Sequence, residues 1–127
     1  MTEQPGGPLV LIVDDNEQNA KLVRDVLRAA GFRTIEAVTG AEAIARAAAD
    51  RPNLVLMDIR LPDIDGAAVA RQLKGDPRTA GIRVVALTAL ASQGAGEWLA
   101  DAGFDGYLEK PIRVREFPDE VRHFSEG

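Results

Sequence analysis

The sequence predicts an α/β protein built on one open sheet of five parallel strands. Two observations lead to this fold class. Strand-like and helix-like stretches alternate along the whole chain, and this order implies parallel pairing because a parallel connection needs a crossover of roughly a dozen residues or more. The strand-like stretches are also almost continuously apolar, which indicates that helices cover both faces of the sheet.

The first strand-like run is LVLIV at residues 9–13, and an amphipathic helix follows it. The next stretch, FRTIEAV at residues 32–38, alternates polar and apolar side chains, which predicts a half-buried strand at an edge of the sheet. Gly31 marks the end of the helix between them. One face of that helix carries Val23, Val26, Leu27 and Ala30.

Thr39 and Glu42 have the spacing of a capping box. They predict the start of an alanine-rich second helix, which should end near Asp50. The run NLVLM at residues 53–57 is then the third strand. Its four consecutive apolar residues indicate a strand buried on both sides.

Asp65 has the residue type of an N-cap, so we expect a third helix that runs from there to about Lys74. The fourth strand is IRVVAL at residues 82–87. A fourth helix is expected from about Ser92 to Ala102, with Gly103 at its end.

The fifth strand is GYLE at residues 106–109, and a last helix carries Val121 and Phe124. Pro118 falls inside the segment expected to form this helix. Because proline fits a helix without loss of a hydrogen bond only in the first turn, the helix should begin late or be kinked.

The composition indicates one domain, because 127 residues can form a single core but not two domains of ordinary size. We place this domain at residues 9–125, after a flexible tail at residues 1–8. A net charge of −5 argues against direct contact with nucleic acid, and the lack of cysteine excludes disulfides and thiolate chemistry. No apolar run approaches the roughly 20 residues of a membrane span, so we expect a cytoplasmic protein without membrane insertion.

Polar residues stand where the predicted strands end, and parallel strands bring these ends to one edge of the sheet. Each residue has an ordinary explanation alone, since Asp caps helices, Thr is common in strands and Lys is usually solvated. Three crowded carboxylates, however, raise the free energy of the ionised state unless cations compensate. Together the five therefore indicate a functional site: Asp14, Asp15, Asp58, Thr88 and Lys110.

The chemistry of these residue types favours phosphoryl transfer to a carboxylate. The three aspartates supply the oxygen ligands that Mg²⁺ requires, and Asp58 can act as the acceptor in its ionised form. Lys110 can place a positive charge beside the phosphoryl oxygens, and Thr88 can donate a hydroxyl hydrogen bond.

The motifs LIVDDN, LVLMDIRLPDIDG, VVALTA and GYLEKPI resemble those of the receiver domain of two-component response regulators. The resemblance covers roughly residues 8–125. It implies a flavodoxin-like, doubly wound sheet with strand order 2-1-3-4-5 and five helices.

By this resemblance Asp58 is the phosphoacceptor. Asp15, Asp58 and the backbone carbonyl of Arg60 hold Mg²⁺, and Asp14 assists through water. The peptide bond before Pro111 is cis in similar domains, which would aim the preceding ammonium group at the site.

The resemblance also implies a switch, in which Thr88 moves toward the phosphoryl group and Tyr107 fills the space left behind. Tyr107 has the alternative of being an ordinary half-buried strand aromatic. The surface expected to change is formed by the fourth helix, the fifth strand and the last helix. Arg60 and Leu90 occupy positions that tune dephosphorylation in similar domains, and the alternative is that both are exposed side chains without effect.

The expected function is that of a signalling switch rather than a turnover enzyme. A sensor histidine kinase or a histidine phosphotransfer protein would supply the phosphoryl group, and a downstream protein would bind the phosphorylated form. Phosphorylation-dependent dimerisation is left open. A phosphatase with an aspartyl nucleophile is disfavoured, because Arg60 stands where such an enzyme places its general acid. A phosphorylation-independent adaptor is the other alternative.

Four further residues could suggest a functional role but have ordinary explanations. His123, the only histidine, should be a surface residue, and Trp98 should pack half-buried or mark a partner-binding patch. Asp63 and Asp65 should serve as turn and cap residues.

Overall fold

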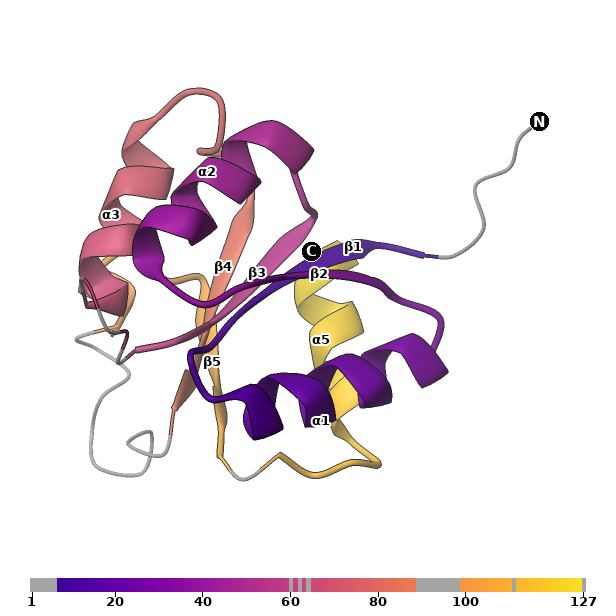
Figure 1. Cartoon of the computed structure of the whole chain (residues 1–127). Helices are drawn as coiled ribbons and strands as arrows, with labels where there is room; N and C mark the ends of the chain where they lie inside the picture. The colour runs from indigo at the N-terminus through magenta and orange to yellow at the C-terminus, as the bar shows by residue number, and fades with distance from the viewer. Residues whose placement is uncertain are drawn as a thin grey trace.

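The fold is one sheet of five parallel strands in the order β2-β1-β3-β4-β5 (Figure 1). The computed structural model describes residues 7–59, 61, 63, 65–88, 99–110 and 112–126. The strands are β1 (Leu9–Val13), β2 (Arg33–Ala37), β3 (Leu54–Asp58), β4 (Arg83–Thr88) and β5 (Gly106–Glu109). The predicted fold class, strand order and parallel pairing are confirmed.

Four helices are described in full: α1 (Glu17–Ala29), α2 (Gly40–Asp50), α3 (Gly66–Gly75) and α5 (Phe117–Glu126). Helices α2 and α3 lie side by side over one face of the sheet, while α1 and α5 cover the other (Figure 1). Most of the predicted helix at about Ser92–Ala102 lies outside the described residues, and its described end, residues 99–101, is helical.

Two apolar clusters fill the space on either side of the sheet. Because successive residues of a strand point to opposite faces, β1 and β3 contribute alternate side chains to each cluster. Leu11, Val13, Val55 and Met57 lie with α2 and α3, whereas Val10, Ile12, Leu54 and Leu56 lie with α1 and α5. Both central strands are therefore buried on both sides, as their continuous apolar sequences predict.

The helix ends carry capping residues, of which Thr39, Asp65, Gly31 and Gly103 are predicted from the sequence and Asn16 is not. Asn16, Thr39 and Asp65 cap α1, α2 and α3, each accepting a hydrogen bond from a backbone N–H in the first turn. Gly31 and Gly103 end their helices with φ values of 98° and 103°, in the region that favours glycine. The predicted ends of the five strands, of α2 and of α3 agree with the structure to within one or two residues.

The capping box of α2 differs in one contact from the expected arrangement. The Thr39 hydroxyl accepts a hydrogen bond from the Glu42 N–H at 3.0 Å, as expected. The Glu42 carboxylate, however, accepts from the N–H of Val38 at 2.9 Å, one residue before the cap. The box thus secures the chain entering the helix rather than the cap residue itself.

Pro118 is accommodated by a late helix start. Helix α5 begins at Phe117, so Pro118 lies in the first turn, where its missing N–H has no partner to lose. The first of the two predicted outcomes is therefore the observed one. Phe117 and Val121 are buried in the cluster shared with α1.

Helix α5 is also fastened to the end of α1. The guanidinium group of Arg122 donates a hydrogen bond to the carbonyl oxygen of Ala30 at 3.0 Å and lies 4.9 Å from the centroid of the Phe32 ring. On its other side, the Phe124 ring occupies the position that a Cβ at Gly106 would need. No helix in the described part of the chain is long and apolar enough to span a membrane.

Candidate functional site

The carboxyl ends of β1 and β3 bring three carboxylates together. Asp14 and Asp15 follow β1 directly, and Asp58 is the last residue of the neighbouring strand β3. One carboxylate oxygen of each lies within 4.8 Å of those of the other two. The fold therefore brings together the three aspartates that were grouped from the sequence, because neighbouring parallel strands end at the same edge of the sheet.

Asp14 is the most buried member of the group, with 3% of its surface exposed. One of its carboxylate oxygens, Oδ1, accepts a hydrogen bond from the Asn16 N–H at 2.9 Å. The other, Oδ2, is buried and accepts no hydrogen bond from the described residues. A buried, unsatisfied carboxylate oxygen is costly, so Oδ2 is an acceptor site suited to a cation or water.

Burial raises the pKa of the Asp14 carboxyl above its ordinary value of 3.8. The hydrogen bond from Asn16 and the positive charge of Lys110 oppose this rise. The negative charges of Asp58 and Asp15 add to it. Ionisation of the Asp14 carboxyl therefore costs more free energy in the folded protein than in water.

Lys110 directs its ammonium group into the carboxylate cluster from the end of β5. Its Nζ atom donates a hydrogen bond to Asp58 Oδ2 at 3.2 Å and lies 3.8 Å from Asp14 Oδ2. Its backbone N–H bonds to the carbonyl oxygen of Thr88 at 2.9 Å, which fixes the start of this side chain relative to β4. One cation thus faces three carboxylates, and a second positive charge would be favourable there.

Thr88 ends β4 one residue beyond Leu87, the partner of Asp58 in the neighbouring strand, and it is buried with 4% of its surface exposed. Tyr107 lies on β5, opposite Ala86 of β4, and 41% of its surface is exposed. This exposure is compatible with an ordinary half-buried strand aromatic as well as with the predicted switch residue, so the role of Tyr107 stays a prediction.

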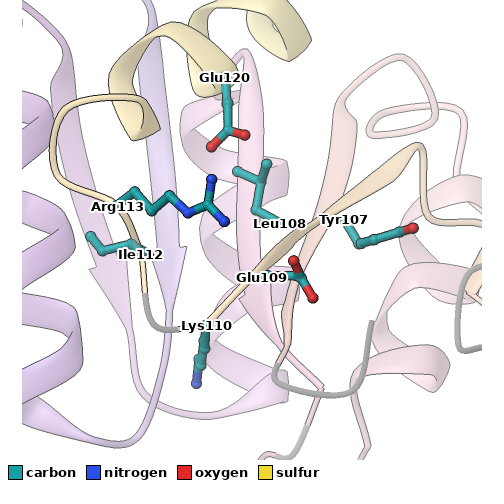
Figure 2. A pocket seen from close by; sticks show the side chains of 7 residues that line it. All are labelled: Tyr107, Leu108, Glu109, Lys110, Ile112, Arg113 and Glu120. Carbon is teal, nitrogen blue, oxygen red and sulfur yellow. The ribbon is translucent and has the colours of Figure 1, made fainter. Parts of the chain in front are cut away.

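A cavity of about 510 Å³ lies between β5 and α5. Figure 2 shows Arg113 and Glu120 pointing toward each other across it, while Tyr107 extends from β5 away from both. Lys110 extends from the end of β5 away from Glu120 (Figure 2). The strand that carries the site lysine therefore also borders a hollow on the predicted output surface.

Several predicted residues lie outside the part of the chain that the structure describes. These are Arg60, Leu90, Pro111 and Trp98. Their predicted roles, which are a metal-binding carbonyl, tuning of dephosphorylation, a cis peptide bond and a partner patch, stay predictions. His123 is exposed, as expected of a surface residue.

Asp63 and Gly66 shape the loop after Asp58 in ways that the sequence did not reveal. Asp63 was expected to serve its own turn, but its carboxylate accepts hydrogen bonds from Gly40 N–H at 2.8 Å and Ala41 N–H at 3.0 Å, in the first turn of α2. Gly66 donates its N–H to the carbonyl oxygen of Ile59 at 2.7 Å. A Cβ at Gly66 would lie 2.9 Å from the Ile59 Cα atom, closer than real contacts allow.

The donor set fits a magnesium ion. Carboxylate oxygens are the ligands that Mg²⁺ prefers, and it commonly binds one or two carboxylates with several waters. The unsatisfied Oδ2 atom of Asp14 supplies a structural reason for a cation in addition to the clustering. Since no residue in this group offers nitrogen or sulfur, a softer metal has no matching ligand.

Comparison with known proteins agrees with this architecture. A family model described as the response regulator receiver domain matches residues 10–122. The polar-differentiation response regulator DivK of Brucella anthropi is 42% identical over 115 residues, which cover 91% of this chain and 94% of that protein. DivK of Brucella ovis is 41% identical over the same length.

Solved structures share the fold over nearly the whole chain. The receiver domain of the sensor histidine kinase PA1611 from Pseudomonas aeruginosa PAO1, solved with a magnesium ion coordinated in its active-site cleft, superposes with a TM-score of 0.86 at 31% identity. The aligned region covers 95% of this chain and 99% of that one. A CheY-like receiver domain protein from Methanospirillum hungatei JF-1 superposes with a TM-score of 0.83 at 26% identity, over 94% of each chain.

Proposed function

The chain belongs to the family of response regulator receiver domains, and from that premise we propose that Asp58 accepts a phosphoryl group from a histidine kinase or a histidine phosphotransfer protein. The family makes it a phosphorylation-based switch of two-component signalling. The proposal concerns which residues perform the transfer and what it changes. Its place of action would be the cytoplasm.

The observation that carries the proposal is the contact between Asp58 and Lys110 inside the acidic cluster. An isolated carboxylate at a strand end would be an ordinary cap, but Asp58 has a cation 3.2 Å from Oδ2 and two further aspartates within 4.8 Å. A phosphoryl group added to Asp58 would meet a fixed ammonium group that already faces its attachment point. Preorganised positive charge of this kind is the main protein contribution to phosphoryl transfer.

The proposed transfer is an in-line displacement at phosphorus. An oxygen of the ionised Asp58 carboxylate attacks the phosphorus of a phosphohistidine, and the new O–P bond forms as the P–N bond breaks. The electron pair of the broken bond stays with the imidazole nitrogen of the donor, which takes up a proton. The Lys110 ammonium then pairs with an oxygen of the transferred group, so its positive charge is retained at the site.

Asp14, Asp15 and Asp58 would hold the magnesium ion. When bound, Mg²⁺ neutralises part of the phosphoryl charge and stabilises the charge that develops during transfer. Asp14 is the buried member of this ligand set, and the Lys110 ammonium lies 3.8 Å from its Oδ2 atom on the side of β5. The Arg60 carbonyl remains a predicted ligand.

Transfer would be converted into a signal through Thr88 and Tyr107. A phosphoryl group brings about −1.5 to −2 units of charge and new acceptor oxygens, which attract the Thr88 hydroxyl. Movement of Thr88 would vacate space behind β4, and the exposed Tyr107 can turn into it. The surface formed by residues 99–102, β5 and α5 would then differ between the two states and select a downstream protein.

Incubation with acetyl phosphate tests the proposal directly. With Mg²⁺, intact-mass spectrometry should show a single phosphoryl adduct, and the adduct should be absent without Mg²⁺ or in Asp58→Ala. An adduct that persists in Asp58→Ala would place the phosphoacceptor elsewhere. No adduct in wild type, with acetyl phosphate or with a panel of histidine kinases, would favour the adaptor.

Lys110→Ala should lower the rate of phosphoryl uptake about tenfold. The expected loss corresponds to one charge-assisted hydrogen bond of roughly 1.5 kcal/mol, given the Lys110–Asp58 contact of 3.2 Å. The rate is measured from the time course of the adduct mass. Lys21→Ala is the control, since Lys21 is exposed and pairs with Asp25 on the surface of α1. Equal rates for both variants would remove Lys110 from the mechanism.

A further inference from the structure

Side chains from two separate parts of the chain accept hydrogen bonds from the backbone N–H groups in the first turn of α2. A helix leaves its first N–H groups without partners inside the helix. Here the Thr39 hydroxyl accepts from Glu42, as an ordinary N-cap does. The two preceding N–H groups, those of Gly40 and Ala41, both donate to the carboxylate of Asp63.

These two bonds connect parts of the chain that are remote in sequence. Asp63 is 23 residues from Gly40, and it lies in the loop between β3 and α3. Each carboxylate oxygen accepts one N–H, at 2.8 Å and 3.0 Å, so the side chain is held in two places. The negative charge also lies at the positive end of the α2 dipole, which strengthens the contact.

The same loop begins at Asp58. Its two ends are closed by the hydrogen bond from Gly66 to Ile59 at 2.7 Å, and Leu61 packs against the apolar cluster beneath α2 and α3. Asp65 then caps α3. The loop is thus fixed to α3 at its ends, and Asp63 fixes it to α2.

We propose that Asp63 is a positioning residue for phosphoryl uptake, because its two hydrogen bonds to α2 hold the loop that leaves Asp58 in the orientation that the transfer requires. The inference rests on the proposed role of Asp58. Asp63 is not one of the three carboxylates of the acidic cluster. Its effect is exerted through the loop, so a helix cap placed elsewhere on α2 should not replace it.

Thr39→Ala provides the matched control. It removes one N-cap hydrogen bond from the first turn of α2, and this bond joins two residues adjacent to or within the helix. The contact between Asp63 and α2 stays in place. Asp63→Ala removes the loop contact and leaves Thr39 in place. Asp63 is exposed, so the substitution leaves no buried cavity that would confuse the comparison.

The test measures the rate of adduct formation from acetyl phosphate and the Mg²⁺ concentration that gives half of the thermal stabilisation. Asp63→Ala should slow uptake at least about fivefold and raise that Mg²⁺ concentration, whereas Thr39→Ala should stay within about twofold of wild type in both. Asp63→Asn, which keeps one acceptor oxygen, should fall between wild type and Asp63→Ala. All rates are taken well below each variant's melting temperature.

Each outcome separates the inference from the function on which it rests. Equal behaviour of Asp63→Ala and Thr39→Ala, with a normal adduct in wild type, would make Asp63 a helix cap only. Faster uptake in Asp63→Ala would mean that its charge repels the donor, and this also overturns the proposal. If wild type forms no adduct that depends on Asp58, the proposed function fails and the role of Asp63 fails with it.

Discussion

Asp14→Asn is expected to make the metal-free protein more stable and to abolish its response to Mg²⁺. In wild type, burial and two neighbouring carboxylates oppose the ionised form of Asp14, and one of its oxygens has no hydrogen-bond donor among the described residues. Asparagine removes this charge while keeping the size of the side chain. The free energy of unfolding without Mg²⁺ should rise by about 1 kcal/mol, a common gain when an active-site charge is relieved.

The raised pKa of Asp14 also sets the sign of a pH dependence. Because the pKa of Asp14 is raised in the folded protein, the unfolded chain loses this proton more easily. The contribution of Asp14 to stability is therefore complete below the ordinary pKa of 3.8 and declines as the pH rises through the raised folded pKa. Asp14→Asn lacks this decline, so its advantage over wild type should grow with pH across that window.

Chemical denaturation with and without Mg²⁺ measures both parts. At ten times its dissociation constant, a ligand that binds only the folded state adds about 1.4 kcal/mol, and Asp14→Asn should lose most of this gain. Asp101→Asn, on an exposed carboxylate outside the acidic cluster, should behave as wild type in both conditions. A metal-free Asp14→Asn protein less stable than wild type would contradict the stated cost of burying Asp14.

Gly66→Ala is expected to destabilise the fold by about 2 kcal/mol and to displace the backbone at Asp58. The three atoms nearest to the added Cβ would all be backbone atoms, among them the Ile59 Cα at 2.9 Å and the Asp58 carbonyl oxygen at 3.0 Å. A flexible side chain could turn aside, but these atoms can move only if the end of β3 and the start of α3 separate. Phosphoryl uptake from acetyl phosphate should therefore fall together with stability.

The same helix provides the control for this prediction. Gly75 ends α3, and a Cβ there would have no atom within 4 Å apart from its chain neighbours and the nearby backbone of its own helix. Gly75→Ala should change the free energy of unfolding by less than about 1 kcal/mol, in the stabilising direction, because alanine loses less backbone entropy in a helix. Similar urea midpoints for the two variants would show that the close approach at Gly66 is not a constraint.

The sequence predicted the sheet and the acidic cluster because both follow from local signals. Continuous apolar runs identify strands buried on both sides, and parallel pairing then forces Asp14, Asp15 and Asp58 to one edge without knowledge of side-chain packing. Strand order itself came from the family resemblance. Alternation between strand and helix is compatible with several orders, and in the confirmed order β1 lies beside β3.

The contacts that the sequence did not predict depend on distances between elements. Asp63 has the residue type of a turn or cap, and nothing near it in the chain indicates that its partners are Gly40 and Ala41. Glu42 similarly reaches one residue beyond its expected partner, because the path of the chain into α2 decides which N–H is nearest. Pro118 left two outcomes, and only the position of Phe117 in the core selected the late helix start.

The packing of α5 against α1 and the sheet has a consequence for the order in which the chain can fold during synthesis. The apolar face made by Val10, Ile12 and Leu27 is completed by Phe117 and Val121 of α5. Those residues leave the ribosome only after all five strands, so this face stays open to solvent, and to other chains, for most of translation. The other face is completed earlier in the chain, because its last members, Ala102 and Phe104, precede β5. A growing chain should therefore close one side of its sheet early and depend on chaperones, or on speed, for the other.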